Sequence, residues 1–405
     1  MGRVAITGMG AVTAAGIGVD PLWTAARDGT STVSQIDRPG FEQARIKHAA
    51  IVRDFDALKF VTPQVLAQLD RFSSMAIASA DEALAQAGIK AGELDETCAV
   101  IVGTGIGGAE TTDLAARAYY LGVTTRSDPM IVPKVMPSAA ASQISMRYGA
   151  RGPVFCVSSA CASSAQAIGI GAQMVRSGMV KRAIVGGTEC FVNGSAMRAW
   201  EVLRVLTPTM NRPFSKGRDG MVLGEGAGIV VLEDMDDAIA RGANVIAELA
   251  GYGTSSDAGD LLKPDPVGAS RAMEQAIAEA GLDTTEIGYV NAHGTGTVLN
   301  DLSETEALSR IFGNRLPDVP VSSTKPVHGH TIGAAGAVEL IVTVKSLLEQ
   351  VVPPTINWQG LDPKCELDMV PNKGRPKSFR AAMSNSFAFG GINASLVVKS
   401  LAKAA

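Results

Sequence analysis

The stretch Arg3-Val4-Ala5-Ile6-Thr7-Gly8 is a short, apolar and β-branched run that ends in glycine. Such a run is typical of a buried strand that leads into a loop. Six further apolar runs follow along the chain, at residues 99–103, 183–187, 228–232, 287–291, 319–322 and 394–398. Amphipathic stretches lie between them, for example 71–87 and 269–280, and these predict helices. This alternation predicts an α/β fold with buried mixed or parallel sheets.

Length and composition set the size of the fold. The chain has 405 residues, of which 46% are hydrophobic and 19% charged. This composition excludes a disordered chain, a collagen and a coiled coil. At roughly 150 residues per domain, the length predicts two or three domains or one large fused unit. The acidic cluster Glu233-Asp234-Met235-Asp236-Asp237 follows a predicted strand, so we place a seam near residue 240, between halves 1–240 and 241–405.

Charge and hydropathy narrow the class of partner. The chain has 36 Lys and Arg residues against 40 Asp and Glu residues, without basic and aromatic residues interleaved, so no nucleic-acid partner is expected. No stretch approaches the roughly 18 unbroken apolar residues of a membrane span. The first residues also lack the long apolar core of a signal peptide. We therefore expect a soluble, cytoplasmic protein with no membrane partner.

One cysteine has the surroundings of a nucleophile. The five cysteines are odd in number and lack C-x-x-C spacing, which argues against a disulfide framework and a cysteine-rich zinc site. Cys161 lies in Ser158-Ser159-Ala160-Cys161-Ala162-Ser163-Ser164-Ala165, just before a predicted buried helix at 166–175. At a helix N-terminus the macrodipole favours a thiolate over a thiol. Taken alone, a cysteine among alanines is also compatible with a small core residue.

Three of the four histidines lie in glycine-rich segments. His293 belongs to Asn291-Ala292-His293-Gly294-Thr295-Gly296-Thr297, and His328 and His330 follow Lys325 in a second segment. A cysteine with two histidines suits acyl transfer followed by stabilisation of a developing enolate. His328 and His330 could instead form a metal pair, but no neighbouring carboxylate or third ligand completes such a site, so we predict no metal. Lys325 is alternatively a solvated surface cation.

Four segments together resemble a known family, the β-ketoacyl-[acyl-carrier-protein] synthases, and among them the bacterial elongating enzymes of the second type. The segments are 160–164, 291–297, 323–336 and Asn385-Ser386-Phe387-Ala388-Phe389-Gly390-Gly391-Ile392-Asn393, and the resemblance runs from Val4 to Asn393. It implies a thiolase fold, in which two similar α/β halves stack as five α-β-α-β-α layers. It also implies a homodimer.

The resemblance implies a decarboxylative condensation. Cys161 would take an acyl chain from acyl carrier protein, and malonyl carrier protein would lose CO2 to give a carbanion that attacks this acyl-enzyme. His293 and His330 would bind the thioester oxygen and stabilise the enolate. Lys325 would hold its charge near His330 and Glu304. No metal and no organic cofactor is implied for this chemistry.

Further roles carried over from the family concern the substrate. The backbone N–H groups of Cys161 and Phe389 would form an oxyanion hole, and Phe389 would also gate the acyl pocket. Thr295 and Thr297 would hydrogen-bond the pantetheine arm. Ile106 would line the acyl pocket, with plain core packing as the alternative.

The chain departs from the family pattern at three places. Ala388 stands where glycine is usual, and a Cβ there would cost roughly 1 kcal/mol or more if gating needs a positive φ. The insert Pro326-Val327-His328 is atypical, and we expect His328 to be structural. Neutral residues replace the usual basic ones before Asp70, which leaves an alternative cationic patch for an acidic carrier protein: Arg204, Arg212, Lys216 and Arg218.

Several of these features resemble the nodulation-type ketosynthases, which build specialised fatty acyl chains. We favour general fatty acyl elongation, with a specialised acyl pathway as the alternative. A degradative thiolase is disfavoured because the loop 385–393 has no second cysteine. A non-catalytic partner subunit that resembles a chain-length factor is disfavoured because Cys161, His293, Lys325 and His330 are all present.

Overall fold

The computed structural model describes residues 2–123 and 128–401. Its strands are β1 Val4–Thr13, β2 Gly16–Ile17, β3 Ser34–Gln35, β4 His48–Ala49, β5 Cys98–Gly103, β6 Val154–Val157, β7 Arg182–Glu189, β8 Gly226–Asp234, β9 Ala247–Ser256, β10 Ile287–Asn291, β11 Val321–Ser322, β12 Val351–Val352, β13 Arg375–Pro376, β14 Ala381–Ala388 and β15 Ile392–Lys399. Its α-helices are α1 Val19–Asp28, α2 Pro63–Leu66, α3 Arg71–Gln86, α4 Ala109–Tyr120, α5 Ile131–Val135, α6 Ala139–Tyr148, α7 Ser163–Arg176, α8 Gly194–Val202, α9 Met235–Ala240, α10 Pro266–Glu279, α11 Val298–Phe312, α12 Lys325–His328 and α13 Ala335–Glu349. The 3-10 turns are η1 Ala57–Lys59, η2 Ala160–Ala162, η3 Thr284–Glu286, η4 Gly313–Asp318 and η5 Ile332–Ala334.

The strand order repeats between the two halves of the chain. The first half contributes the order β6-β5-β7-β8-β1 and the second half the order β11-β10-β14-β15-β9. When the five sheet strands of each half are numbered 1 to 5 in chain order, both halves have the spatial order 3-2-4-5-1. The two sets meet where Ala5 and Ile6 of β1 pair with Glu248 and Ala247 of β9. The repeat confirms the prediction of two similar halves, while the division at residue 240 itself stays a prediction.

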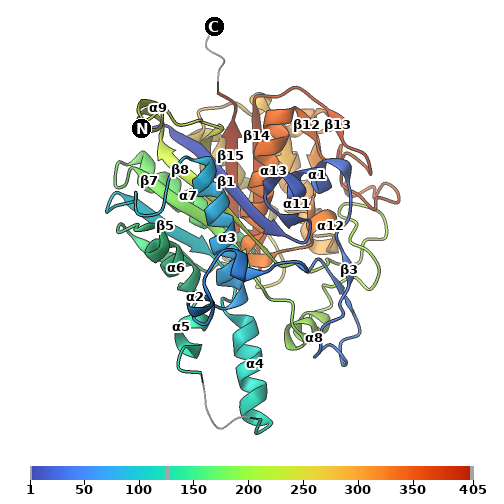
Figure 1. Ribbon diagram of the computed structural model, residues 1–405. Coiled ribbons are helices and arrows are strands. Elements are labelled where there is room, and N and C mark those ends of the chain that lie inside the picture. The colour runs from blue at the N-terminus through green and yellow to red at the C-terminus, as the bar shows by residue number, and fades with distance from the viewer. Residues whose placement is uncertain (1, 124–127, 402–405) are drawn as a thin grey trace.

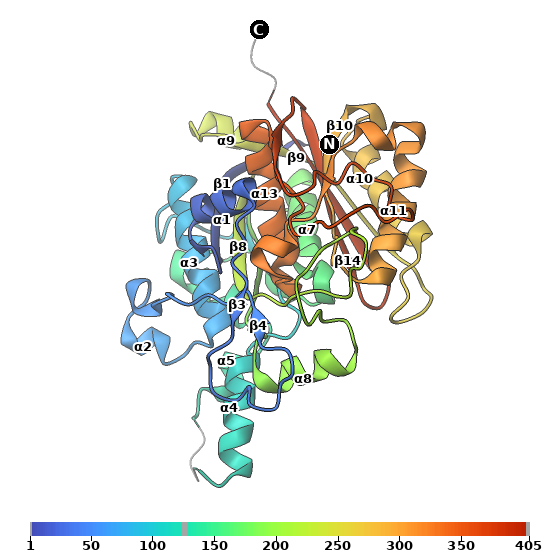
Figure 2. The same ribbon diagram turned by 90° about the vertical axis from the view of Figure 1, so that its right-hand side faces the viewer.

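Helices and sheets alternate as layers (Figures 1 and 2). Helix α3 packs on β1 and β8 on one outer side, and α10 packs on β9 and β15 on the other, with α11 against it. The central helices α7 and α13 contact each other and strands of both halves. These contacts give the α-β-α-β-α order that was predicted. Helices α4 and α5 extend away from this layered body (Figure 1).

The apolar runs of the sequence mark strands correctly. All seven predicted runs overlap a strand, and α3 and α10 cover the two predicted amphipathic helices. Of the ten strands in the main order of the large sheet, β6, β9 and β14 were not predicted, and neither were the two-residue strands β2, β3, β4, β12 and β13. Strand β14 has the sequence AAMSNSFA and is buried throughout, because small and polar residues fill the tight space against α13. None of the helices in the described ranges has the length and apolar character needed to cross a membrane.

Candidate active site

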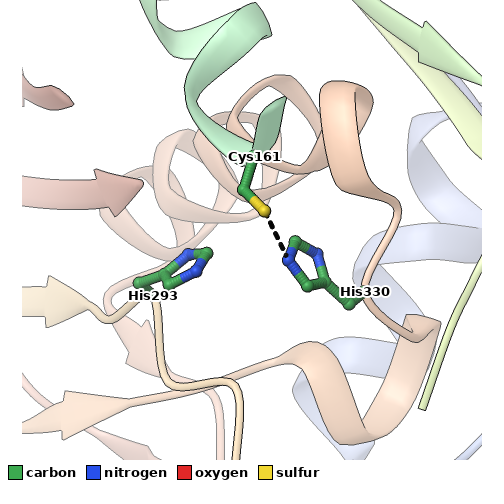
Figure 3. A group of neighbouring side chains, drawn as sticks. All are labelled: Cys161, His293 and His330. Atoms are coloured by element: carbon green, nitrogen blue, oxygen red, sulfur yellow. Dashed lines mark hydrogen bonds between the residues drawn. The ribbon is translucent and has the colours of Figure 1, made fainter. Parts of the chain in front are cut away.

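Three separate segments bring Cys161, His293 and His330 together (Figure 3). Cys161 lies in η2 at the N-terminal side of α7, His293 follows β10, and His330 follows α12. The Sγ atom of Cys161 is 3.1 Å from Nε2 of His330. The two imidazole rings face each other edge to face, with their centroids 5.3 Å apart. All three side chains are buried.

The turn that carries Cys161 is held in an uncommon backbone conformation. Ala160 has a φ of 50°, which side-chain-bearing residues rarely adopt. The Ser163 hydroxyl accepts a hydrogen bond from the Ser159 N–H and donates one to the Ala160 carbonyl. Gly103 passes so close that a Cβ there would lie 2.4 Å from the Ser163 carbonyl carbon. The end of β5 therefore needs glycine, and the turn is fixed on both sides.

Burial controls the protonation state of Cys161. Desolvation raises the pKa of its thiol to about 12, although the positive charge of Lys325 acts in the opposite direction. The expectation that the helix N-terminus would favour a resting thiolate is therefore wrong. Removing the thiolate from water outweighs the helix dipole, which contributes at most about 2 kcal/mol in partly buried sites. The resting side chain of Cys161 is therefore a thiol at neutral pH.

Hydrogen bonds at Nδ1 fix both catalytic-site histidines in one tautomer. The ammonium group of Lys325 lies 3.3 Å from Nδ1 of His293 and donates to the His293 carbonyl at 2.5 Å. The backbone N–H of Ile332 donates to Nδ1 of His330 at 3.3 Å. Burial, followed by the charge of Lys325, lowers the pKa of each ring well below its usual value, so both are neutral. Each Nε2 therefore carries the proton and is a donor, and that of His330 points at Sγ.

The same donors argue against a metal ion at this site. The ligand atoms of Cys161, His293 and His330 lie within 4.8 Å of one another, a spacing that a metal could use. A metal-bound histidine normally donates its other ring N–H to an acceptor. Here both Nδ1 atoms accept hydrogen bonds instead. The residues present therefore fit a pair of neutral N–H donors and do not fit a metal centre.

His328 takes no part in this arrangement. Its Nδ1–H donates to the Gly329 carbonyl at 2.8 Å, and its Nε2 is 3.0 Å from the Thr324 hydroxyl. Complete burial, followed by the charge of Lys325, lowers its pKa to about 3. The ring thus stays neutral and secures the backbone between Lys325 and His330, in line with the structural role expected for it.

Lys325 is a buried cation whose ion-pair partner the sequence analysis missed. Its Nζ lies 2.6 Å from Oε1 of Glu339, and both side chains are fully buried. The charge of Lys325 acts on Glu304, as expected, but the hydrogen bonds to the Glu304 carboxylate come from the N–H groups of His293 and Gly294, both at 2.8 Å. Burial raises the pKa of both glutamates to about 7. The sequence did contain a signal for this ion pair, because Glu339 is the one carboxylate in the otherwise apolar start of α13.

Glu189 is a second residue that the sequence analysis missed. Its carboxylate accepts the N–H groups of Gly105 at 2.6 Å and Gly333 at 3.0 Å, and the hydroxyl of Thr104 at 3.1 Å. It therefore ties the loop after β5 to the segment that follows His330. Nothing in its local sequence distinguishes it from an ordinary strand terminus.

A cavity of about 310 Å³ leads to the three residues. Thr295 and Thr297 line it, with their hydroxyl oxygens 2.8 Å apart. Phe389 lines it too and stacks on Trp200 at a centroid distance of 6.0 Å. Ile106 does not line this cavity, and 48% of its surface is exposed in the single chain. The prediction that Ile106 lines the acyl pocket therefore finds no support within one described chain.

The loop that was predicted to gate the pocket is unstrained at Ala388. This residue ends β14, pairs with Ile392 and does not adopt a positive φ. The left-handed conformations fall on Gly390 and Gly391, with φ of 84° and 68°. The Cβ of Ala388 therefore costs nothing in this conformation. The oxyanion-hole role of the Cys161 and Phe389 N–H groups stays a prediction.

The predicted cationic patch is smaller than expected. Arg218 is buried and pairs with Asp301 and Asp362, at 3.2 and 2.5 Å. Arg212 is largely buried and lies 3.5 Å from Asp219. Buried arginines of this kind satisfy structural carboxylates and do not face a partner. Of the four predicted residues, only Arg204 and Lys216 are exposed.

Comparison with known proteins identifies the family. Residues 1–238 match the N-terminal domain of β-ketoacyl synthases and residues 246–359 match the C-terminal domain. The chain belongs to the β-ketoacyl synthase family. Its layered architecture is the thiolase fold of that family, and the chain is a condensing acyltransferase.

The similar proteins include a nodulation protein, a 3-oxoacyl synthase and a polyketide ketosynthase. The chain is 43% identical to Nodulation protein E of Rhizobium sp. (strain N33), over 98% of this chain and 99% of that protein. It is 38% identical to 3-oxoacyl-[acyl-carrier-protein] synthase 2 of Staphylococcus aureus (strain COL), over 98% of each. A solved ketosynthase, described as a type II polyketide synthase acyl carrier protein in complex with its hexaketide-bound ketosynthase, matches with a TM-score of 0.91 and 28% identity, over 99% of this chain and 100% of that one.

Proposed function

We propose that the chain joins an acyl group held on Cys161 to a two-carbon unit from malonyl-[acyl-carrier-protein], giving 3-oxoacyl-[acyl-carrier-protein] and CO2. The observation that carries this proposal is the pairing of one buried thiol with two neutral histidines whose Nε2–H groups face the same cavity. Acyl transfer needs the thiol, and enolate formation needs the two donors.

The first step loads the nucleophile. Cys161 gives up its thiol proton and attacks the carbonyl carbon of an acyl-pantetheine thioester, so that a new C–S bond forms. The old C–S bond breaks, and the pantetheine sulfur leaves with that proton. The Nε2–H of His330, at 3.1 Å, stabilises the transient thiolate despite its raised pKa. The N–H groups of Cys161 and Phe389 are proposed to hold the oxyanion.

The second step makes the carbon nucleophile. The bond between the malonyl carboxylate and its α-carbon breaks, CO2 leaves, and the electron pair moves onto the thioester oxygen. Two preorganised imidazole donors in a buried site stabilise that oxygen by several kcal/mol. The buried ring of Phe387 lies 6.1 Å from that of His293 and makes this side of the site apolar. The α-carbon then bonds to the acyl carbon, and the C–S bond to Cys161 breaks, so that Cys161 leaves as a thiolate and takes up one proton from solvent.

The partner of this reaction is an acyl carrier protein in its acyl and malonyl forms. Cys161 is only 5% exposed, so a long flexible arm must deliver each thioester through the cavity. Thr295 and Thr297 line the cavity with neighbouring hydroxyl groups, which supports a role for them in hydrogen-bonding the arm. Binding of a carrier protein by a similar ketosynthase supports this proposal.

We further propose a homodimer built on strand β6. This strand is the last one at its end of the sheet, and among the described residues its outer edge has no strand partner. Its four residues are half-buried along the whole strand, although three are apolar. Such an edge is favourable for pairing with a second copy. Ile106 would then gain the protein surroundings that a single chain does not provide.

General fatty acyl elongation is the substrate class we favour. A specialised acyl pathway is a second candidate, because identity to the nodulation proteins E exceeds identity to the elongating synthase. The test is intact-mass analysis after mixing with acyl carrier proteins loaded with C4 to C18 chains, followed by malonyl carrier protein. Adducts on Cys161 with many chain lengths, each extended by two carbons, support elongation, whereas one narrow class supports the specialised role. A folded protein that forms no adduct with any chain contradicts the proposed reaction.

A further inference from the structure

Glu189, at the end of β7, carries a fully buried carboxylate that hydrogen-bond donors stabilise. Its Oε2 accepts the N–H groups of Gly105 and Gly333, at 2.6 and 3.0 Å. Its Oε1 accepts the hydroxyl of Thr104 at 3.1 Å. Burial nevertheless raises the pKa of this carboxyl to about 7. A carboxylate that is so costly to bury points to a role for the contacts that it makes.

The donors to Glu189 come from two loops that build the candidate site. Thr104 and Gly105 directly follow β5, and the Gly105 carbonyl accepts a hydrogen bond at 3.1 Å from Ser158, beside the nucleophile turn η2. Gly333 lies in η5, the turn that follows the histidine facing the thiol. A Cβ on Gly333 would lie 2.3 Å from the Gly105 nitrogen, so the two loops are in direct contact. One carboxylate therefore joins the loop beside the nucleophile to the loop beside the histidine.

The η5 turn is strained at Ile332. This residue has a φ of 44°, which a β-branched side chain rarely adopts. Such a conformation costs about 1–3 kcal/mol and persists only where its surroundings enforce it. The N–H of Gly333 belongs to the peptide unit directly after Ile332, so its hydrogen bond to Glu189 holds the strained residue in place. The N–H of Ile332 donates to Nδ1 of His330 at 3.3 Å, and relaxation to a negative φ would turn this donor away from the ring.

We propose that Glu189 is a positioning residue for His330. The proposal rests on the function proposed above, in which the Nε2–H of His330 stabilises the thiolate and the enolate. By holding the η5 turn, Glu189 keeps a backbone N–H against Nδ1, and the ring proton stays on Nε2. Lys325 has the corresponding position beside Nδ1 of His293. Each of the two histidines thus has its own donor at Nδ1, a buried cation for one and a strained backbone N–H for the other.

Two substitutions separate the reach of Glu189 from its charge. Glu189→Asp keeps the charge but withdraws the carboxylate by about 1.5 Å, one C–C bond length, which is too far for the bond to Gly333. Glu189→Gln keeps the reach, because its amide oxygen can accept both glycine N–H groups while its NH2 group donates to the Thr104 hydroxyl. CO2 release from malonyl carrier protein should fall at least about tenfold in Glu189→Asp and stay within about threefold of the wild type in Glu189→Gln.

A second measurement follows the tautomer of His330 directly. In ¹⁵N NMR of histidine-labelled protein, with the His330 signals assigned by their loss in His330→Gln, protonated and unprotonated ring nitrogens are distinct. The proton should be on Nε2 in the wild type and in Glu189→Gln, and should move toward Nδ1 in Glu189→Asp. The matched control is Glu233→Asp, because Glu233 is also fully buried near the end of a strand of this sheet but pairs with arginines. This control should leave the tautomer and CO2 release as in the wild type.

Relief of the strain provides a third test. Glycine adopts a positive φ without cost, so in Ile332→Gly the turn no longer depends on Glu189. Glu189→Asp added to Ile332→Gly should lower CO2 release by less than about threefold relative to Ile332→Gly alone. This comparison decides the question even where Glu189→Asp alone does not fold.

Four results would overturn the inference. They are wild-type CO2 release from folded Glu189→Asp, an unchanged tautomer of His330 in that variant, and a full defect of Glu189→Asp on the Ile332→Gly background. The fourth is a defect of Glu189→Gln as large as that of Glu189→Asp, which would show that charge matters and reach does not. A wild type that releases no CO2 refutes the proposed function, and the tautomer measurement then decides the positioning role independently.

Discussion

Replacing Glu339 by glutamine tests whether the buried ion pair sets the tautomer of His293. Glu339 and Lys325 are both fully buried, and their charged atoms lie 2.6 Å apart. The second oxygen of Glu339 has no hydrogen-bond partner among the described residues, so the pair with Lys325 is its main interaction. Breaking one side of a buried pair costs about 3–5 kcal/mol, because an uncompensated charge stays behind. Glu339→Gln should therefore lower the free energy of unfolding by about that amount.

The chemical effect follows from the same contacts. Without its counter-ion, the Lys325 ammonium group loses the contact that holds it beside Nδ1 of His293. An Nδ1 atom without this donor is no longer kept unprotonated, so the ring proton can move from Nε2 to Nδ1. His293 then loses the donor that faces the thioester oxygen. Loss of one such donor typically lowers the rate by about 10²–10³-fold. The defect should fall on decarboxylation, while Cys161 is still acylated.

The assay is CO2 release from malonyl carrier protein, measured beside acyl-adduct formation by intact mass on protein whose fold is checked by circular dichroism. Glu349→Gln is the matched control, because Glu349 is on the same helix but forms half-exposed pairs with Arg27 and Lys345. It should behave like the wild type in both assays. Folded Glu339→Gln protein with wild-type CO2 release would refute the reasoning.

Four further predictions concern other parts of the chain. The rate of alkylation of Cys161 by iodoacetamide, followed by peptide mapping, should increase throughout the range from about pH 7 to about pH 9, because burial raises the pKa of the thiol to about 12. A rate that is already constant below about pH 7 would contradict a resting thiol. The free energy of unfolding of His328→Gln should rise by about 2 kcal/mol relative to that of the wild type as the pH falls from about 6.5 to about 5. The reason is that His328 has a pKa of about 3 in the fold, so that the wild type loses stability once the pH falls below the pKa of histidine in the unfolded chain. Urea titrations that give parallel pH curves for the two proteins would exclude this. Ala388→Gly should lower the unfolding free energy by about 1 kcal/mol, since the strand backbone there needs no positive φ, and a more stable variant in the same titration would argue for hidden strain. Phe155→Asp on the edge strand β6 should raise the dissociation constant of the proposed dimer by about tenfold or more. A molar mass by light scattering that equals that of the wild type at low concentration would show that β6 is not part of the interface.

Local patterns were sufficient to predict seven strands of the large sheet and the segments that the fold brings together around Cys161. A strand in the middle of a buried sheet must be apolar on both faces, which is why runs such as 183–187 and 228–232 were visible. Loops that bring backbone close to a ligand need glycine, which is why the segments around His293 and His330 stood out. The strand β14 escaped notice because its two faces pack against close neighbours and need small residues more than large ones.

Properties that depend on distant partners could not be predicted in this way. The ion pair of Lys325 with Glu339 joins residues on two helices, and the fold alone determines that both are buried. The protonation state of Cys161 depends on how completely the fold excludes water, which the sequence around it does not reveal. The charges of Arg212 and Arg218 appeared available in the sequence, but structural carboxylates engage them. In each case a long-range contact decides what a charged or reactive group does.

The internal repeat explains how one chain builds two different halves of its proposed active site. Both central helices start after a 3-10 turn whose first residue has a positive φ, namely Ala160 at 50° before α7 and Ile332 at 44° before α13. Such conformations cost about 1–3 kcal/mol each and persist only where the surroundings enforce them. In the first half, the second position of this turn is Cys161. In the second half the same position is Gly333, where a Cβ would lie 2.3 Å from the Gly105 nitrogen, so no nucleophile fits. The strained turn of the second half instead orients His330: the N–H of Ile332 donates to Nδ1 of His330, so that the Nε2–H of this ring faces Cys161.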